Sequence, residues 1–186
     1  MGIHLSYPML LRMLSKKDGY NLFNNQKKFE TGPDLPTVSI LIPVYNEESV
    51  VENRINNIFQ SNYPKDKIEI IVIDSGSNDD TRLIIQSKFQ GRVTLITEPI
   101  RSGKAHAINL GLNSASGDII ILTDGTTLYY RETIVGLVEP FGDNTIGAVS
   151  AFYDVPNSDE SVVTASEKKF WIYKDKLRFL ESVVYS

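Results

Sequence analysis

The feature that most constrains the fold of this chain is a short apolar run that ends abruptly in a polar turn. Residues 119–122 are all Ile or Leu, and Thr123-Asp124-Gly125-Thr126 follows directly. A run this short, bounded by turn residues, predicts a buried strand rather than a helix. Asp124 would then lie at the carboxyl end of a strand, where open parallel sheets bind ligands. Asp124 is therefore the central site candidate, although the residue alone is equally compatible with capping a helix or turning the loop.

The same order of strand, polar loop and helix recurs along the chain. Apolar runs rich in β-branched residues predict strands at residues 38–42, 68–73, 92–97, 119–123 and 146–152. Apolar residues at helical spacing predict helices between them, at about residues 50–59, up to residue 89, at 105–114 and at 131–141. This alternation predicts an α/β fold with a mostly parallel central sheet and helices on both faces.

Single residues are predicted to begin or end these elements. Pro43 has no backbone N–H and should stop the first strand. Asn46 should cap the first helix, and Ser77 or Asn78 the second. Gly117 should close the third helix.

The compact domain is predicted to span residues 37–153. Residues 1–36 look like an appendage, because Lys and Arg outnumber Asp and Glu, residues 21–26 are polar and rich in Asn, and the segment ends in the linker-like Thr-Gly-Pro-Asp-Leu-Pro. Within them, the apolar residues 3–14 and the following Lys16-Lys17 favour contact with a membrane surface over a terminal helix packed on the domain. Residues 154–186 are predicted to form a loop and an amphipathic helix with a basic flank.

Bulk composition excludes several classes of function. A net charge of -4 and a pI of about 5.2 disfavour nucleic acid as a partner. The sequence has no Cys, which excludes disulfides and thiolate metal sites. No apolar run is long enough to span a bilayer. A secretory signal is disfavoured, because residues 3–14 have no basic segment before them and no small-residue cleavage site after them. The fingerprints of P-loop NTPases, dinucleotide-binding domains and Ser hydrolases are also absent.

Four polar loops follow predicted strands and should meet at one rim of the sheet. They lie at residues 43–47, 74–77, 101–104 and 124–127. At such a rim, Tyr45 can cover a base or sugar ring, and Asp74 can accept hydrogen bonds from a base or ribose. Lys104 can face phosphates, and Asp124 can hold a ribose or a metal ion.

Three stretches resemble the donor-binding half of the family 2 glycosyltransferases, which have a GT-A fold. In order and spacing they cover about residues 36–152, and they read TVSILIPVYNEESVVENRINNIF, IEIIVIDSGSNDDT and RSGKAHAINLGLNSASGDIIILTDGTT. The later stretch SEKKFWIYKDKLRFLESVVYS resembles the helix that follows in the membrane-embedded branch of cellulose, chitin and hyaluronan synthase-like enzymes.

The resemblance implies a single Rossmann-like nucleotide-binding domain that transfers a sugar from a nucleotide diphosphate sugar, typically UDP-linked. It implies Mg2+ or Mn2+ as cofactor and a saccharide or lipid-linked acceptor. A divalent metal and a nearby cation can stabilise the charge on a departing diphosphate. The resemblance also implies polysaccharide biosynthesis at the cytoplasmic face of the membrane.

The residues that match the family's donor-binding motifs are Pro43, Tyr45, Glu47, Asp74, Lys104 and Asp124. The first three match the loop beside the nucleoside, and Asp74 matches the acidic residue after the second strand. Lys104 matches the basic residue of the G-K-A segment. Asp124 matches the first Asp of the D-x-D motif, which makes it the expected metal ligand.

The sequence departs from the family pattern at two points. Thr126 stands where the second Asp of D-x-D is expected, and a hydroxyl is a weaker ligand for a hard cation than a carboxylate. Metal binding would then rest on Asp124 and the diphosphate, or on another group such as Asp154. No residue matches the acceptor-side general base, so the catalytic base is unknown and the chain is expected to hold the donor-binding part.

Two other functions compete with sugar transfer. A non-catalytic nucleotide-sugar binding or partner module, or an inactive fragment, would fit Thr126 and the missing acceptor half. A nucleotidyltransferase that makes the sugar nucleotide is disfavoured, because the first strand is followed by Tyr45-Asn46-Glu47 rather than by a Gly-rich, Arg-containing loop.

Overall fold

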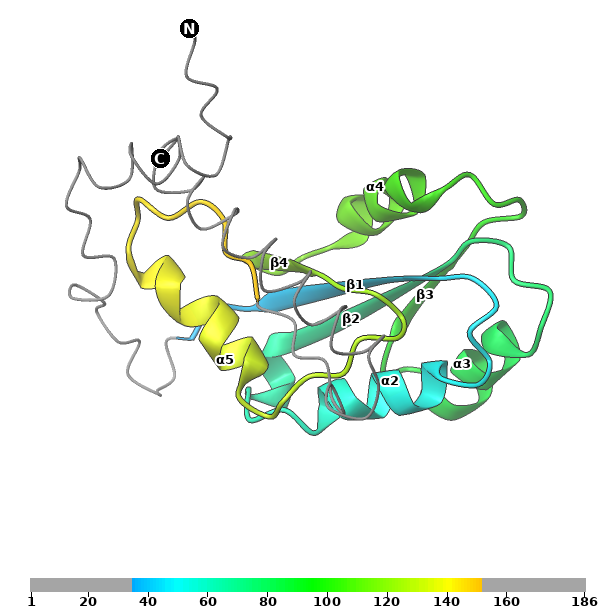
Figure 1. Cartoon of the computed structure of the whole chain (residues 1–186), viewed down its shortest axis with the longest axis horizontal. Coiled ribbons are helices and arrows are strands. Elements are labelled where there is room, and N and C mark those ends of the chain that lie inside the picture. The colour runs from blue at the N-terminus through cyan, green and yellow to red at the C-terminus, as the bar shows by residue number, and fades with distance from the viewer. Residues whose placement is uncertain (1–34, 152–186) are drawn as a thin grey trace, which may run out of the picture. The chain divides into compact units, whose positions relative to one another are not determined.

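The computed structural model describes residues 35–151, and its helices and strands all lie in one compact unit, Lys28–Ala148. In chain order they are β1 (Val38–Val44), α2 (Val51–Phe59), the 3-10 turn η1 (Lys65–Lys67), β2 (Ile68–Asp74), α3 (Thr81–Phe89), β3 (Thr94–Thr97), α4 (Lys104–Ser114), β4 (Ile119–Leu122), α5 (Thr133–Val138) and the 3-10 turn η2 (Glu139–Gly142) (Figure 1). None of the helices in this part of the chain is long and apolar enough to cross a bilayer.

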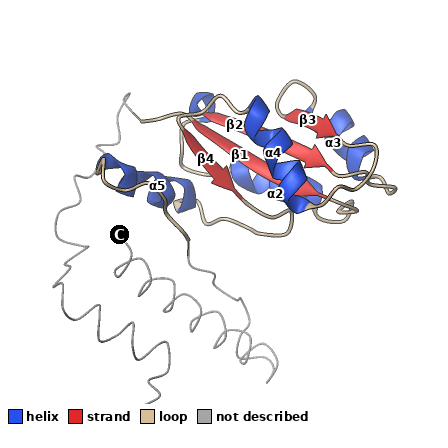
Figure 2. Cartoon of the chain, turned by 90° about the horizontal axis from the view of Figure 1, so that it is seen from above, coloured by secondary structure: helices blue, strands red, loops and turns tan. Residues whose placement is uncertain are grey.

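The four strands form one parallel sheet in the order β3-β2-β1-β4 (Figure 2). Strand β1 pairs with β2 along its whole length, from Val38 opposite Ile68 to Val44 opposite Asp74. On its other side it pairs with β4, which ends at Leu122 opposite Leu41. The predicted α/β fold with a parallel sheet is confirmed, and all four carboxyl ends lie at one edge.

The core is divided between the two faces of this sheet. Alternate residues of a strand point to opposite faces. Ile40 and Ile42 pack into the larger cluster, which also contains residues of α2, α3 and α5 and of the neighbouring strands. Leu41, between them, packs with Ile71, Ile73 and Ala107 of α4. Helices therefore cover both faces, with α4 on one side and α2 and α3 on the other (Figure 1).

The sequence analysis predicted that Pro43 ends β1, which is wrong. The strand continues to Val44, because the position of Pro43 tolerates a residue without a backbone N–H. The carbonyl of Leu41 accepts from Thr123 on the β4 side, whereas the carbonyl of Val44 accepts from Ser75 on the β2 side. Pro43 therefore faces the β4 side, beyond the last residue pair of β1 and β4. No ladder hydrogen bond is lost there, which is where sheets admit Pro.

The predicted helix caps are also wrong. No side-chain cap is formed at the start of α2, where Val50 is the N-cap, or by Asp80, the N-cap of α3. Asn46, Ser77 and Asn78 bond to one another instead, as described below. Gly117 does not close α4 either, because the helix ends at Ser114 with Ala115 as its C-cap.

The strand predicted at residues 146–152 does not form over its described part, residues 146–151. Within the described chain, these residues pair with no strand. Their two β-branched residues, Ile146 and Val149, are half-buried, and the other four residues are exposed. The helix predicted at 131–141 is divided into α5 and the 3-10 turn η2, which contains Pro140. The predictions for residues 1–34 and for Asp154 and the amphipathic helix near the C-terminus lie outside the described residues.

Candidate functional site

The carboxyl ends of the strands bring the predicted loops together at one rim. Backbone hydrogen bonds join neighbouring strand ends: Ser75 N donates to Val44 O at 3.0 Å, and Glu98 N donates to Asp74 O at 2.8 Å. Thr123 N donates to Leu41 O at 3.1 Å on the other side. The rim therefore carries the loops after β1, β2, β3 and β4 side by side, which is where open α/β sheets bind ligands.

Lys104 and Asp124 meet at this rim. The ammonium group of Lys104, the first residue of α4, forms an ion pair with Asp124 Oδ1. The two side chains are 61% and 46% exposed, so a ligand can reach both charges. The structure thus joins a cation from the loop after β3 to the carboxylate after β4, which the sequence analysis expected to share one ligand.

Tyr45 lies beside the same β3–α4 loop. The guanidinium group of Arg101 stacks over the Tyr45 ring, with its central carbon 4.2 Å from the ring centroid. This contact is a cation–π interaction. It connects the loop after β1 with the loop that leads to Lys104, and it adds Arg101 to the groups of the rim.

Glu47 lies next to the turn that carries Asp124. A Cβ atom on Gly125 would lie 3.5 Å from Glu47 Cγ and 3.6 Å from Glu47 Cδ, so the Glu47 side chain packs against this turn. Its backbone N–H donates to Thr81 Oγ1 at 2.8 Å. Among the described residues its carboxylate has no hydrogen bond or ion pair, so the structure leaves this acceptor available at the rim.

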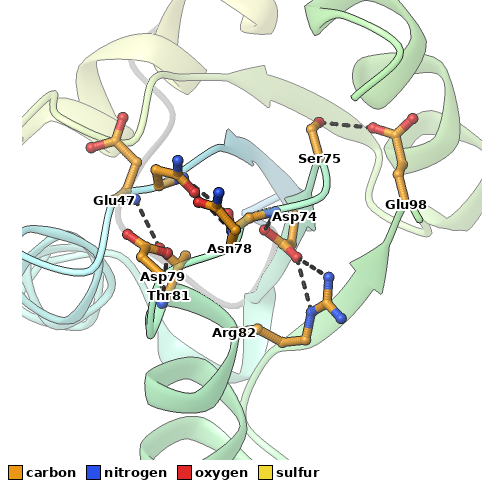
Figure 3. A network of polar contacts seen from close by, with 10 residues as sticks. Glu47, Asp74, Ser75, Asn78, Asp79, Thr81, Arg82 and Glu98 are labelled. Carbon is orange, nitrogen blue, oxygen red and sulfur yellow. Dashed lines mark hydrogen bonds and ion pairs between the residues drawn. The ribbon is translucent and has the colours of Figure 1, made fainter. Parts of the chain in front are cut away.

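Asp74 lies at the rim, but both oxygens of its carboxylate already accept hydrogen bonds from other residues of the chain (Figure 3). Its side chain is buried, and its Oδ2 accepts from Arg82 Nη2 at 2.7 Å and from Arg82 Nε at 3.0 Å. Its Oδ1 accepts from Ser77 N at 3.2 Å. Asp74 therefore orders the loop after β2, and its contact with a base or ribose stays a prediction.

The loops after β1 and β2 are bonded into a single unit. Asn46 adopts a positive φ of 54°, donates from its N–H to Ser77 Oγ at 2.9 Å, and accepts from Asn78 N at 3.0 Å through Oδ1. This exchange explains why these residues do not cap helices.

Burial acts to raise the pKa of Asp79, but hydrogen bonds from the Thr81 hydroxyl and backbone N–H outweigh it and leave that pKa lowered.

Arg54 is a residue of the site that sequence reasoning missed. It is buried on α2, and its guanidinium donates to Thr123 Oγ1 and to the backbone carbonyl of Asp124. Its position falls within the apolar stripe formed by Val51, Ile55 and Ile58. An Arg at such a position was the available signal, because a buried charge requires partners.

Two further groups at the rim were not predicted. One is Arg82. Its spacing from Asp74 did not predict the ion pair between them, because the shape of the intervening turn was unknown. The other is Glu98, a buried residue just after β3. Its Oε2 accepts from Ser75 Oγ at 2.8 Å, and its Oε1 lies 2.6 Å from His106 Nδ1 on α4. Glu98 thus connects the ends of β2 and β3 with the first turn of α4.

A divalent metal fits this site only together with a ligand that brings its own oxygens. Within residues 35–151, no three His, Asp or Glu side chains are grouped as a metal-ligand set. Mg2+, however, is commonly held by one or two carboxylates plus substrate phosphates. Asp124 already binds a cation, the Lys104 ammonium, and the Glu47 carboxylate packs beside the same turn. These two carboxylates would hold the metal from the protein side.

Replacing Arg82 with Met tests the structural role of the Asp74 ion pair. The substitution leaves a buried carboxylate without its charged partner, which is destabilising. Because the Arg82 side chain is 40% exposed, solvent screens part of this effect. We expect the free energy of unfolding in urea to fall by about 1–2 kcal/mol.

Lys88→Met is the matched control for that experiment. Lys88 lies on the same helix and pairs with Glu52, and both side chains are nearly half exposed. Exposed pairs contribute little, so the control should change stability by less than about 0.5 kcal/mol. Equal effects of the two substitutions would contradict a special role for the Arg82–Asp74 pair.

Comparison with known families agrees with this geometry. The model of the family described as Glycosyl transferase family 2 matches residues 39–184. The probable glycosyltransferase YdaM of Bacillus subtilis is 33% identical over 181 residues, which cover 88% of this chain and 42% of that protein. The poly-beta-1,6-N-acetyl-D-glucosamine synthase of Staphylococcus aureus is 30% identical over 128 residues, covering 68% of this chain and 31% of that protein. The chain therefore spans less than half the length of these relatives.

A solved structure shows the same arrangement of elements. The mannosyltransferase PcManGT from Pyrobaculum calidifontis, in complex with GDP-Man and Mn2+, matches with a TM-score of 0.67 and 32% sequence identity. The match covers 82% of this chain and 45% of that one. This likeness confirms the GT-A fold that the sequence motifs implied.

Proposed function

The chain belongs to glycosyl transferase family 2, and from this premise we propose that it provides the donor site of an enzyme that transfers a sugar from a nucleotide diphosphate sugar to a saccharide or lipid-linked acceptor. The observation that carries the proposal is the meeting of Lys104 and Asp124 at the rim, with Glu47 beside the same turn. These three side chains come from three loops that lie far apart in the sequence.

Each group has a chemical task in this proposal. Lys104, at the N-terminus of α4, would bind the diphosphate, since a helix N-terminus and an ammonium group both favour anions. Asp124 and Glu47 would hold a divalent cation from the protein side. When bound, that cation would stabilise the negative charge of the leaving nucleotide. Tyr45 would cover the ring of the nucleoside.

The nature of the donor and metal is a finer part of the proposal. UDP as the leaving group follows from the resemblance of the three motif stretches to family 2 glycosyltransferases, which typically use UDP-sugars. The structurally similar mannosyltransferase of Pyrobaculum calidifontis is instead in complex with GDP-Man and Mn2+. We therefore take UDP as the first candidate, GDP as the second and Mn2+ as the metal.

A second candidate function is a nucleotide-sugar binding module without transferase activity. Thr126 favours it, because this residue supplies a hydroxyl where the family motif has a second carboxylate. The two candidates share the donor site and differ only in turnover. Release of free sugar or transfer to an acceptor by the purified chain would exclude the module.

Calorimetric titration of the full chain with UDP and with GDP, in Mn2+, tests the donor site. We expect one of the two nucleotides to bind, and chelation of Mn2+ by EDTA to weaken its binding by about tenfold or more, which corresponds to roughly 1.4 kcal/mol. The nucleosides uridine and guanosine serve as controls and should bind far more weakly, because they lack the diphosphate. Failure of both diphosphates to bind would overturn the proposal.

A further inference from the structure

We propose that Arg54 is a positioning residue of the donor site, which fixes the backbone of Thr123-Asp124 so that the Asp124 carboxylate is presented to Lys104 and to the diphosphate. The inference rests on the proposed function. Arg54 would not touch the donor; it would act through Asp124. Its place on α2, away from the predicted motif loops, is why no motif assigned it a role.

The contacts of Arg54 converge on the turn after β4. Its side chain is 1% exposed. Nη2 donates to Thr123 Oγ1 at 2.8 Å, and Nε donates to the backbone carbonyl of Asp124 at 3.3 Å. Nη1 donates to Asn57 Oδ1 at 3.0 Å on the same helix. The planar fork of a guanidinium group thus grips two consecutive residues, one by its side chain and one by its backbone.

The other end of the turn is also fixed by α2. Asn57 Nδ2 donates to the carbonyl of Tyr129 at 2.9 Å, and Tyr129 N donates to Asn57 Oδ1 at 2.7 Å. The Arg54 guanidinium lies over the Tyr129 ring, 4.1 Å from its centroid. Arg54 and Asn57, one helical turn apart, therefore hold residues 123 to 129 at both ends. Asp124 lies inside this held segment, with its carboxylate half exposed.

The burial of Arg54 argues against a role in stability alone, because a buried charge is a poor way to stabilise a fold. The surrounding stripe of α2 is apolar, and replacing a buried charged group by a well-packed apolar residue is often neutral or stabilising. The guanidinium is instead bonded to the two residues that lead into the site. A bidentate Arg also fixes orientation in a way that the single ammonium of Lys does not.

A double-mutant cycle separates positioning from general stabilisation. The variants are Arg54→Lys, Asp124→Asn and the combination, titrated in Mn2+ with the nucleotide that the unchanged chain binds. We expect Arg54→Lys to weaken nucleotide binding about fivefold to tenfold in the native background and less than twofold when Asp124→Asn is present. Non-additivity of this kind is the signature of residues that act as a unit.

Arg92→Lys is the matched control. Arg92 stacks over the Phe59 ring of α2 at 4.1 Å, and among the described residues it has no hydrogen bond or ion pair with the Asp124 turn. Its substitution should leave nucleotide affinity within twofold. Thr123→Val, which removes one acceptor of Arg54 and keeps the charge, serves if Arg54→Lys does not fold, and it should weaken binding about threefold.

The outcomes distinguish the two proposals. If the unchanged chain binds neither UDP nor GDP, the proposed function fails and this inference fails with it. If the chain binds nucleotide but Arg54→Lys has the full effect in the presence of Asp124→Asn, only the inference is overturned. Native affinity of both Arg54→Lys and Thr123→Val would also overturn it.

Discussion

Replacing Asp124 with Asn is expected to weaken binding of the nucleotide diphosphate in Mn2+ by at least about tenfold, the largest effect of any single change at the rim. The substitution keeps the shape of the side chain and removes its charge. It therefore removes the carboxylate that we propose as the metal ligand and also breaks the ion pair with Lys104. An amide oxygen remains a possible ligand but is weaker than a carboxylate for a hard cation.

The strength of the metal dependence makes this prediction specific. In the unchanged chain, nucleotide affinity should rise when Mn2+ is added. In the Asp124→Asn variant, this rise should largely disappear. Calorimetric titration with and without EDTA measures the metal dependence of each chain. Asp118→Asn is the control, because Asp118 lies at the amino end of β4, where it accepts from the backbone and hydroxyl of Thr37. An Asp124→Asn chain that keeps full, metal-dependent affinity would remove Asp124 from the site.

Replacing Gly117 with Ala is expected to lower the free energy of unfolding by about 2–3 kcal/mol. A Cβ atom at this position would lie 2.5 Å from Ser39 N and 2.7 Å from Val38 C, both in the backbone of β1. The N–H of Gly117 also donates to Ser39 Oγ at 2.8 Å. The added methyl group therefore cannot be accommodated by a rotamer change, and the entry to β4 must move away from β1.

The matched control for Gly117→Ala is Gly136→Ala. Gly136 lies in α5, is exposed, and a Cβ there would meet no atom within 4 Å. Because Ala favours the helix more than Gly does, this change should stabilise the chain by up to about 1 kcal/mol. Urea unfolding of both variants measures the difference. A change at Gly117 as small as that at an exposed position would show that β1 and this segment are not in close contact.

The elements of the fold could be predicted because their signal is local. Strands β1, β2 and β4 are short apolar runs, and each ends in a polar loop, so their existence and parallel arrangement follow from the sequence alone. The places where prediction failed depend on neighbours in space. Pro43 can stay in a strand because β4 ends before it, whereas residues 146–151 pair with no strand in the described part of the chain.

The site was predicted in part for the same reason. Lys104 and Asp124 both follow strands of a parallel sheet, so the sequence could place them at the same rim. Their direct contact could not be inferred, because β3 and β4 are the two outer strands of the sheet and it is α4, packed across β2 and β1, that brings Lys104 to Asp124. Arg54 and Arg82 lie on helices. Arg82 bonds to Asp74 across the turn that leads into its own helix, and the shape of that turn could not be read from the sequence. Arg54 bonds to a turn that comes much later in the chain. No spacing rule connects Arg54 to Asp124, 70 residues later. Only the observation that a charge stands in an apolar stripe could have marked Arg54 in advance.

The position of β4 beside β1 has a consequence for synthesis of the chain. Asp118, at the start of β4, bonds to Thr37, which precedes it by 81 residues. At a translation rate of about 5–20 residues per second, one side of β1 waits about 4–16 s for its partner. An unpaired strand edge invites pairing with other chains. The nascent polypeptide should therefore be most vulnerable to aggregation, and most in need of chaperones, until β4 has left the ribosome.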